Sequence, residues 1–469
     1  MLTDTFSLIL LDTGLSTGAM IFLGICLLAV CGFEFVNGFH DTANAVATVI
    51  YTNTLRPVVA VVWSGIWNFL GVMVGGIAVA MGIANLLPLA DMMAQPLADN
   101  IAMVLAILLS AIAWNLYTWY YGIPCSSSHT MIGAMLGAGI AFFYTHGGMG
   151  VNWAKAGEIG ASLLLSPAFG FSMAVLLMFL LRWLVKNEAI FREPEHDQHP
   201  PLWIRGILVL TCTLVSFFHG SNDGQKGVGL IMVVLMAFMP IQFALNSSMD
   251  PAQVNVALIQ AEEAIKSSAE GNVLTKELTA SAELIALLRA DFAELHPEDK
   301  VQKFNIRKRL QTLVKDLKLA LKDPGSIPDP QNRERIRESI APLQDYTDYA
   351  PRWAVLMISL SLGIGTMIGW KRIVVTIGEK IGKSHLTYAQ GATAEIIAAS
   401  TIGLSTGLGL PVSTTHVLSS GVAGTMVASR GVANLQRSTI VNIGLAWVLT
   451  LPVTMILAAL LYMGFRLFV

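Results

Sequence analysis

Two pairs of short polar motifs interrupt the long apolar runs of this chain. In the first pair, "GFHDTANA" (38–45) aligns with "GSNDGQKG" (220–227), which matches Asp41 with Asp223. A carboxylate is costly to bury inside a membrane, so ionisable residues there are candidates for function by default. The two aspartates are therefore the first candidate site residues.

The second pair, "PCSSSHTMIGAMLGAGI" (124–140) and "PVSTTHVLSSGVAGTMV" (411–427), has a hydroxyl triplet, a histidine and then small residues. Proline is favoured in the first turn of a helix, so we expect Pro124 and Pro411 to open helices. The free N–H groups and positive dipole end of such a helix attract an anion. The hydroxyls would add donors without adding charge; these residues are Ser126, Ser127, Ser128, Ser413, Thr414 and Thr415.

These motifs form one unit that occurs twice. Asp41 precedes His129 by 88 positions and Asp223 precedes His416 by 193, and the excess is close to the length of the polar segment 246–349. Duplicated units with polar, Gly- or Pro-interrupted segments are typical of secondary transporters, which bind their substrate at the interface of the repeats. The loop charges allow the two repeats to be inverted.

Composition predicts a membrane protein. The chain is 54% hydrophobic and 13% charged, whereas a soluble protein carries about 25% charged residues. Its apolar runs are long and continuous, unlike the short alternating strands of an outer-membrane barrel. We therefore expect an all-α polytopic membrane protein, with 10–12 transmembrane helices in two inverted repeats, broken or half-helices, and a helical soluble insert. Candidate spans lie near 20–38, 57–84, 100–122, 124–145, 156–181, 202–220, 222–245, 350–370, 387–407, 411–429 and 438–465.

The same runs divide the chain into domains. The first transmembrane repeat covers 20–185, and the second covers 202–245 and 350–469. Residues 246–349 form a hydrophilic insert, whose apolar residues recur at three- and four-residue spacing as in amphipathic helices. We expect this insert on the cytoplasmic side.

Short loops rich in Lys and Arg stay cytoplasmic, which places the 182–205 connection inside. Counting every later run as a full crossing puts a later group of basic residues outside, against this rule. One run is therefore not a simple crossing, and we expect half-helices near 39–50 and 222–238. The basic residues in question are Lys371, Arg372, Lys380 and Lys383.

The aspartates need a positive charge beside an anion site, because a carboxylate repels an anion in a low dielectric. The charge could be a proton on Asp41 or Asp223, a cation held between carboxylate and substrate, or a protonated substrate. Phosphate has its second pKa at about 6 to 7, so near neutral pH part of it still carries a proton that it can donate in a hydrogen bond. Sulfate carries no proton there.

Lys226 stands where the first repeat has Asn44. It either snorkels to an interface, or its ammonium replaces a metal cation in the second half of the site, which leaves protons to drive transport. Glu34 and Glu395 are further candidates for a proton relay. His129 and His416 are expected to fix the hydroxyl loops, since two separated histidines without a third ligand are a weak metal signal.

Two other classes of function fit the sequence less well. A hydrolase needs one activated serine beside its base, whereas this chain has two equivalent hydroxyl triplets. A passive anion channel is disfavoured because buried carboxylates would repel a free anion. The chain also shows no basic stripe interleaved with aromatics, so we expect no nucleic-acid partner.

Several stretches of the chain closely resemble the inorganic phosphate transporter (PiT) family, particularly its bacterial low-affinity members. These stretches are "NGFHDTANAVATVIYT", "SSSHTMIGA", "HGSNDGQKGVGL", "IGTMIGWKRIVVTIGEKIGK" and "PVSTTHVLSSGVAGTMV". The resemblance implies an electrochemically driven phosphate symporter of the bacterial inner membrane, multi-pass and often a homodimer. For bacterial members it implies proton coupling and uptake of a neutral complex of phosphate with a divalent metal such as Mg²⁺.

The family pattern G-A-N-D-V-A-N-A differs here, because His40 replaces Asn in the first motif and "GQKG" replaces the end of the second. Sodium-coupled phosphate symport and a sulfate permease of the same fold stay as alternatives. We expect no permanently bound cofactor and no fixed metal site; the lipid bilayer is a partner, and arsenate should also be carried. The resemblance carries over Asp41, Asn44, Ser127, Ser128, Asp223, Thr414 and Thr415 as substrate or coupling ligands. Asn222 joins the expected substrate-binding set, and Asn37 and His40 join the residues that support the motifs.

Overall fold

The computed structural model describes residues 15–93, 95–148, 150–194, 199–269, 275–296 and 298–468. The regular elements of these residues are helices, as predicted. The chain divides into two compact units. The first comprises Met1–Pro88, Leu97–Val234 and Ala350–Val469, and the second comprises Leu89–Pro96 and Leu235–Tyr349.

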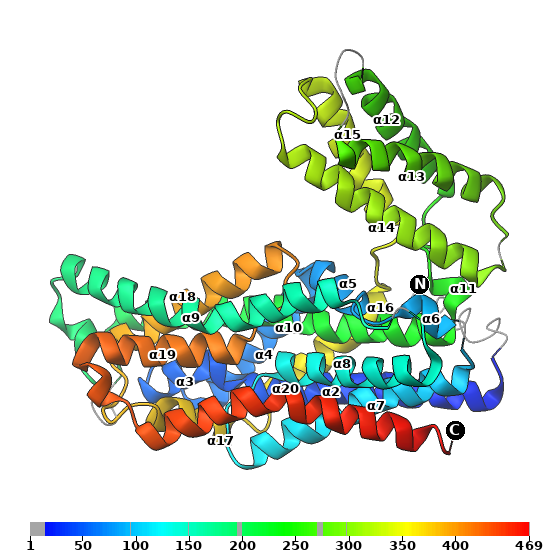
Figure 1. Ribbon diagram of the computed structural model, residues 1–469. Coiled ribbons are helices and arrows are strands. Elements are labelled where there is room, and N and C mark those ends of the chain that lie inside the picture. The colour runs from blue at the N-terminus through cyan, green and yellow to red at the C-terminus, as the bar shows by residue number, and fades with distance from the viewer. Residues whose placement is uncertain are drawn as a thin grey trace. The chain divides into compact units, whose positions relative to one another are not determined.

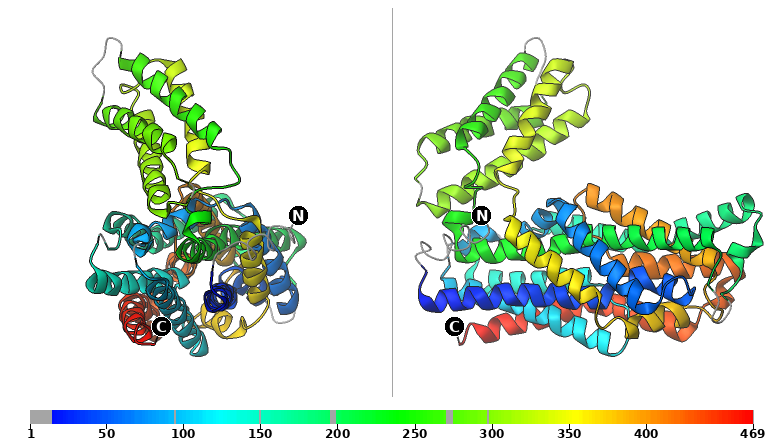
Figure 2. Two further views of the ribbon diagram at one scale, coloured as in Figure 1. Left: turned by 90° about the vertical axis from the view of Figure 1, so that its right-hand side faces the viewer. Right: turned by 180° about the vertical axis from the view of Figure 1, so that it is seen from behind.

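Long helices lie side by side in the first unit (Figures 1 and 2). Six helical segments are long and apolar enough to span a membrane, and a seventh candidate is a pair of helical segments bent by 55°. The chain is therefore a multi-pass membrane protein. The helices of this unit are α2 (Thr17–Asp41), α3 (Ala43–Tyr51), α4 (Pro57–Val74), α5 (Ala78–Ala84), α7 (Leu97–Tyr120), α8 (Ser127–His146), α9 (Trp153–Leu184), η1 (Glu188–Phe191), α10 (Leu202–Phe238), α16 (Arg352–Thr366), α17 (Lys371–Val375), η2 (Thr376–Lys380), α18 (Tyr388–Gly407), α19 (Thr414–Arg430), η3 (Val432–Asn434) and α20 (Arg437–Phe465).

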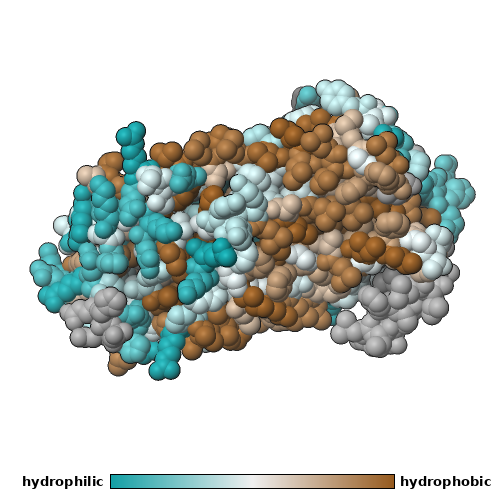
Figure 3. All heavy atoms as spheres, turned by 90° about the horizontal axis from the view of Figure 1, so that it is seen from below, coloured by the Kyte–Doolittle hydropathy of each residue, from teal (hydrophilic) through white to brown (hydrophobic). Residues whose placement is uncertain are grey.

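Much of the outer surface of the first unit is apolar, with hydrophilic side chains gathered toward the ends of the face in view. Figure 3 shows hydrophobic side chains over much of the face that it presents. Exposed large side chains follow one side of α20, among them Leu445, Val448, Ile456 and Leu460. By contrast, α8 and α19, which carry the hydroxyl triplets, are buried along most of their length. These two helices, together with α18, are not among the six candidate spans.

Neither of the two predicted half-helices is present as a separate half-helix. The segment near 39–50 continues the preceding helix: α2 and α3 form one helical segment, Thr17–Tyr51, interrupted only at Thr42. The Thr42 hydroxyl donates to Gly38 O at 2.6 Å and to Thr366 O at 2.9 Å. The segment 222–238 is instead the second half of α10, one continuous helix of 37 residues. The expectation of a half-helix there, and of separate spans at 202–220 and 222–245, was wrong because the polar motif does not interrupt the helix.

A single α10 changes the counting of sides. It brings residues 371–383 to the side of the basic 182–205 connection, as the rule for positive loops requires. Two contacts support this common side. Lys383 N donates to Asn434 O at 2.7 Å, and Arg430, near Asn434 in the chain, pairs at 2.7 Å with Glu193 of the 182–205 connection. The insert belongs to the second unit, and its cytoplasmic placement stays a prediction.

The two repeats pack reciprocally, since α8 lies against α20 and α9 lies against α19. Glycines at matched positions of the second motif pair allow both approaches. A Cβ at Gly137 of α8 would overlap the backbone of Met455, and one at Gly424 of α19 would lie 2.6 Å from Phe171 O. The last helix of each repeat thus covers the hydroxyl helix of the other.

The second unit is also helical, and the amphipathic pattern of the insert is confirmed as helical. Its helices are α6 (Leu89–Met93), α11 (Pro240–Phe243), α12 (Pro251–Ala269), α13 (Lys276–Ala293), α14 (Lys300–Lys322) and α15 (Pro330–Asp345). Apolar residues from α12 to α15 form its core, including Leu258, Ile285, Leu310, Leu313 and Ile336. Its longer segment begins at Leu235, before the predicted start of the insert.

Candidate functional site

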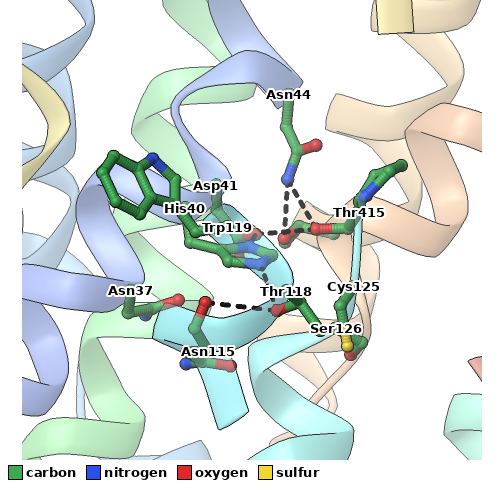
Figure 4. Close-up of polar contacts among 12 residues, drawn as sticks. Asn37, His40, Asp41, Asn44, Asn115, Thr118, Trp119, Cys125, Ser126 and Thr415 are labelled. Carbon is green, nitrogen blue, oxygen red and sulfur yellow. Dashed lines mark hydrogen bonds and ion pairs between the residues drawn. The ribbon is translucent and has the colours of Figure 1, made fainter. Parts of the chain in front are cut away.

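The first half of the candidate site joins the break after α2 to the start of α19 (Figure 4). Thr415 Oγ1 donates a hydrogen bond to Asp41 Oδ1 at 2.8 Å. Asn44 Nδ2, on α3, donates to Thr415 Oγ1 at 3.0 Å and lies 3.4 Å from Thr414 Oγ1. The acid motif of the first repeat therefore meets the hydroxyl triplet of the second.

The second half joins the middle of α10 to the start of α8. Lys226 Nζ lies 2.6 Å from Asp223 Oδ2 and donates a hydrogen bond to the Ser128 hydroxyl. Ser128 in turn donates to Val412 O at 2.8 Å. The Lys226 side chain is 0% exposed, so the snorkelling alternative is wrong. Its charge is fully buried and is paired within the site.

These two halves are equivalent in the repeat alignment. Asn44 matches Lys226, and Thr415 matches Ser128. The contact of Asn44 with Thr415 is thus repeated by the contact of Lys226 with Ser128. The crossed arrangement, with each acid motif on the hydroxyl helix of the other repeat, forms one shared site from both repeats.

Serines rather than prolines start the hydroxyl helices. Ser126 Oγ accepts a hydrogen bond from His129 N at 3.2 Å, and Ser413 Oγ accepts from His416 N at 3.1 Å. Both serines are N-caps, which are the residues that satisfy free N–H groups at a helix start. Pro124 and Pro411 precede the helices by three residues, so their predicted place in the first turn was wrong.

Free polar groups remain at this junction. Among the described residues, the buried Ser127 hydroxyl and Asn44 Oδ1 have no hydrogen-bond partner. Buried polar groups usually have one, and groups left open beside a helix start are suited to a polar ligand. The triplets therefore have unused capacity, chiefly at Ser127.

The two motif histidines lie against one another. The rings of His129 and His416 have centroids 4.5 Å apart, and His416 stacks on Trp447 at 3.9 Å. His129 Nδ1 also lies 2.9 Å from Ser126 Oγ. The histidines thus connect the two helix starts, while Trp447 was not singled out from the sequence.

A third histidine, His219, lies between the two aspartates and was missed by the sequence analysis. Its Nε2 is 3.7 Å from Asp41 Oδ2 and 3.6 Å from Asp223 Oδ2, and its Nδ1 is 2.8 Å from Asn68 Oδ1. The signal that could have found it is its position four residues before Asp223, which is the same face of a helix. These three side chains are close enough to hold one cation, either a metal ion or a proton.

His40 supports the first aspartate from the other side. Its Nδ1 is 3.1 Å from Asp41 Oδ1, and its Nε2 is 3.1 Å from the hydroxyl of Thr118 on α7 (Figure 4). Thr118 is a further residue that sequence reasoning missed, because nothing in its own surroundings in the chain marks it. The imidazole ties the acid motif to α7.

The other predicted residues lie farther out. Glu34 accepts a hydrogen bond from Asn37 at 3.0 Å and packs against Gly227, next to Lys226. Asn222 donates to Leu410 O at 3.2 Å, just before the second hydroxyl triplet. Glu395 accepts from the hydroxyl of Thr211 instead of contacting the aspartates. The structure therefore brings Glu34 and Asn222 to the edge of the site and leaves Glu395 apart.

Known proteins share this sequence and fold. A family model described as the phosphate transporter family matches residues 37–458. The low-affinity inorganic phosphate transporter PitA of Escherichia coli (strain K12) is 40% identical over 493 residues, covering 96% of this chain and 97% of that protein. A low-affinity inorganic phosphate transporter of Buchnera aphidicola subsp. Acyrthosiphon pisum (strain APS) is 40% identical over 482 residues, covering 93% and 95%. A solved structure titled "The sodium-dependent phosphate transporter" has a TM-score of 0.55 at 20% identity, covering 96% of this chain and 100% of that one.

Proposed function

The chain belongs to the phosphate transporter family, and on this premise we propose that it imports inorganic phosphate across the bacterial inner membrane by proton symport. The observation that carries the proposal is the crossed site, in which each buried acid motif meets the hydroxyl helix of the other repeat. A site made by both repeats changes when the repeats move against each other, which is what alternating access requires.

In this proposal phosphate lies where the two hydroxyl helices begin. The Ser127 hydroxyl, which has no partner among the described residues, and the helix N–H groups donate to its oxygens. The hydroxyls of Ser128 and Thr415 already have partners in the acid motifs, so substrate binding would rearrange those contacts. Phosphate binding would thereby change the contacts of the acid motifs that contain Asp41 and Asp223.

Lys226 supplies a built-in positive charge in the second half of the site. The ammonium lies between the Asp223 carboxylate and the Ser128 hydroxyl, which is where a bound cation would link carboxylate and substrate. The first half has the neutral Asn44 at the matching position. We therefore propose that a metal cation is not needed as the coupling ion in the second half, which leaves coupling to protons.

His219 supports proton coupling through its hydrogen bonds. The Thr366 hydroxyl donates to Leu362 O, so it accepts from Asn68 Nδ2, and Asn68 Oδ1 accepts from His219 Nδ1–H. In the neutral imidazole the hydrogen is therefore on Nδ1. His219 Nε2 faces the two aspartates, and without a proton it would present a lone pair to two carboxylates. A proton on this nitrogen or on a carboxylate relieves the repulsion.

Glu34 and Glu395 are the remaining buried carboxyls of the proposal. Glu34, beside Gly227, would pass a proton toward the second half of the site.

A neutral complex of phosphate with a divalent metal such as Mg²⁺ is the proposed substrate, because it lowers the charge that enters a buried site. Arsenate, with the shape and protonation of phosphate, would follow the same route, and a homodimer is compatible with this mechanism.

Two alternatives give different results in transport assays. A sodium-coupled symporter would take up phosphate only with sodium, and a sulfate permease would accumulate sulfate instead. A membrane hydrolase would turn over an ester without any ion gradient. The two equivalent triplets favour a shared binding site over a single activated serine.

The test is uptake of radiolabelled phosphate into liposomes that contain the purified protein. We expect uptake that follows an inward proton gradient, ignores sodium and depends on Mg²⁺. Collapse of the gradient with a protonophore is the control. Uptake that requires sodium would remove proton coupling and keep the substrate, whereas sulfate accumulation without phosphate uptake would overturn the substrate itself.

A further inference from the structure

A cavity of about 620 Å³ opens in the first unit where the end of α7 meets α17 and η2. Three basic residues, Lys371, Arg372 and Lys380, line it. They are part of the basic group that the sequence analysis could not place on the expected side, and the transport site does not use them. The aromatic residues in its lining include Trp119, Tyr120 and Tyr121.

The wall of this cavity is held by hydrogen bonds between its two sides. Trp119 Nε1 donates to Gly369 O at 2.7 Å, and Thr376 Oγ1 donates to Gly122 O at 2.7 Å. Arg372 Nη1 donates to Tyr120 O at 2.6 Å. The Arg372 guanidinium also lies 5.1 Å from the ring centroid of Trp119 and 4.8 Å from that of Tyr120. The guanidinium is therefore fixed before any ligand arrives.

The cavity carries positive charge without a matching acid. No carboxylate lines it, and the ion pairs found among the described residues include none of its three cations. The neighbouring acid in the chain, Glu379, interacts with the Tyr51 hydroxyl. An anion in the cavity would thus meet three exposed basic side chains.

Its position is at one end of the membrane unit. The cations lie on the side of the basic 182–205 connection, where positive loops face the cytoplasm. Tyr120 and Tyr121 are 58% and 61% exposed, as is common for aromatic residues at the membrane surface. Basic pockets between membrane helices on this side bind anionic lipid headgroups.

We propose that this cavity binds the phosphate group of an anionic phospholipid headgroup. Arg372 and the two lysines bind the phosphate, while Trp119 and Tyr121 border the glycerol region. Free inorganic phosphate has the same chemistry, but the volume is in the range that holds drug-sized ligands rather than a lone oxyanion. The site shares no lining residue with the transport site, so it is independent of the proposed function.

The test compares lipid retention by native mass spectrometry, using protein taken from nanodiscs of phosphatidylglycerol and phosphatidylcholine. We expect the protein to retain phosphatidylglycerol, and the variant K371Q/R372Q/K380Q to bind it up to about 100-fold more weakly, since each lost ion pair with the lipid phosphate weakens binding by up to about a factor of five. The matched control, K186Q/R205Q/K383Q, removes the same charge from the same end but outside the cavity. It should bind phosphatidylglycerol within about twofold of the parent protein.

A double variant, K371Q/K380Q, leaves the hydrogen bonds of Arg372 in place and keeps the test usable if the triple variant does not fold. Equal lipid loss in the cavity and control variants would overturn the proposal, because general charge would then explain retention. Displacement of the lipid by millimolar inorganic phosphate would show that the free anion is the ligand and would also overturn the headgroup assignment. Each result stands whether or not the protein transports phosphate.

Discussion

The two halves of the candidate site have the same scaffold and different charges. In the first half Asp41 is held by neutral Thr415 and by His40. In the second half Asp223 is held by the ammonium of Lys226, which also donates to Ser128. The duplicated fold brings the same positions together in both halves, and a single position, Asn44 or Lys226, decides whether the half carries its own cation.

This difference teaches how a duplicated site becomes asymmetric without a change of fold. Close packing and helix caps are kept in both repeats, as the glycines of α8 and α19 and the caps Ser126 and Ser413 show. The charge differs at the aligned position whose side chain faces the site, which is Asn44 in the first half and Lys226 in the second. The two halves can therefore take different roles, and substitutions at matched positions test which role each has.

The largest expected effect comes from removing the acid of the second half. Asp223→Asn leaves Lys226 as an uncompensated buried charge, and breaking a buried pair costs about 3–5 kcal/mol. We expect phosphate uptake to fall by at least about 100-fold, with a lower yield of folded protein. Uptake into liposomes and thermal melting of the purified variant measure these two effects.

A double variant that makes both members of the ion pair neutral distinguishes the effect of the Asp223 charge on transport from its effect on stability. The variant D223N/K226M should recover the melting temperature of the parent protein, because no unpaired charge remains, while uptake stays low. Full uptake by D223N alone would contradict a role of this carboxylate in transport.

A smaller effect is expected when the second half is made to resemble the first. Lys226→Asn removes the built-in cation and leaves the Asp223 carboxylate without its ion-pair partner, so that a cation from solution would have to take its place. We expect uptake without sodium to fall about tenfold or more, which corresponds to about 1.4 kcal/mol, and to recover in part when sodium is added. The measurement is initial uptake across a sodium series at fixed proton gradient.

The matched control for this substitution is Asn44→Gln, which keeps a neutral amide in the first half and should not create a response to sodium. Full activity of K226N with unchanged cation dependence would show that the Lys226 ammonium does not replace a cation.

The smallest effect concerns packing at the position that follows Lys226. Gly227 matches Ala45 of the first motif, and a Cβ at Gly227 would overlap the Glu34 side chain and lie 2.7 Å from Glu34 Oε1. We expect Gly227→Ala to lower the free energy of unfolding by about 1–3 kcal/mol, the usual cost of overpacking. Thermal melting in detergent measures it.

Two variants check the cause. G227A/E34A removes the overlapping side chain and should recover part of the lost stability, whereas Ala45→Gly in the first motif should cost only about 0.5–1 kcal/mol. A melting temperature of G227A equal to that of the parent protein would mean that Glu34 does not need the space beside Gly227.

Much of this architecture could be predicted from the chain. Apolar runs predicted membrane helices, and the aligned motifs predicted a duplication whose matched positions do make matched contacts, such as Asn44 with Thr415. The continuity of α10 could not be predicted, because "GSNDGQKG" has the glycines and polar residues of a break. Its glycines instead allow close approach, as Gly220 does toward Asn68 on α4.

The prolines of the second motif pair also led to a wrong prediction of where the hydroxyl helices start. Proline is acceptable in a first turn, but the serine two residues later accepts a hydrogen bond from the helix and so sets the start. His219 was missed for another reason, since a histidine is informative only when its neighbours are known. Its two carboxylate neighbours come from different repeats.

The sequence by itself determined the membrane class, the duplication and the residue types of the site, because hydrophobic length and motif spacing are properties of the chain alone. Only the tertiary structure decided which motifs meet. The crossed pairing of each acid motif with the other repeat's hydroxyl helix, and the burial of Lys226 between Asp223 and Ser128, depend on how α8, α10 and α19 pack. Packing between segments far apart in the chain leaves no trace in local spacing, which is why the contacts had to come from the fold.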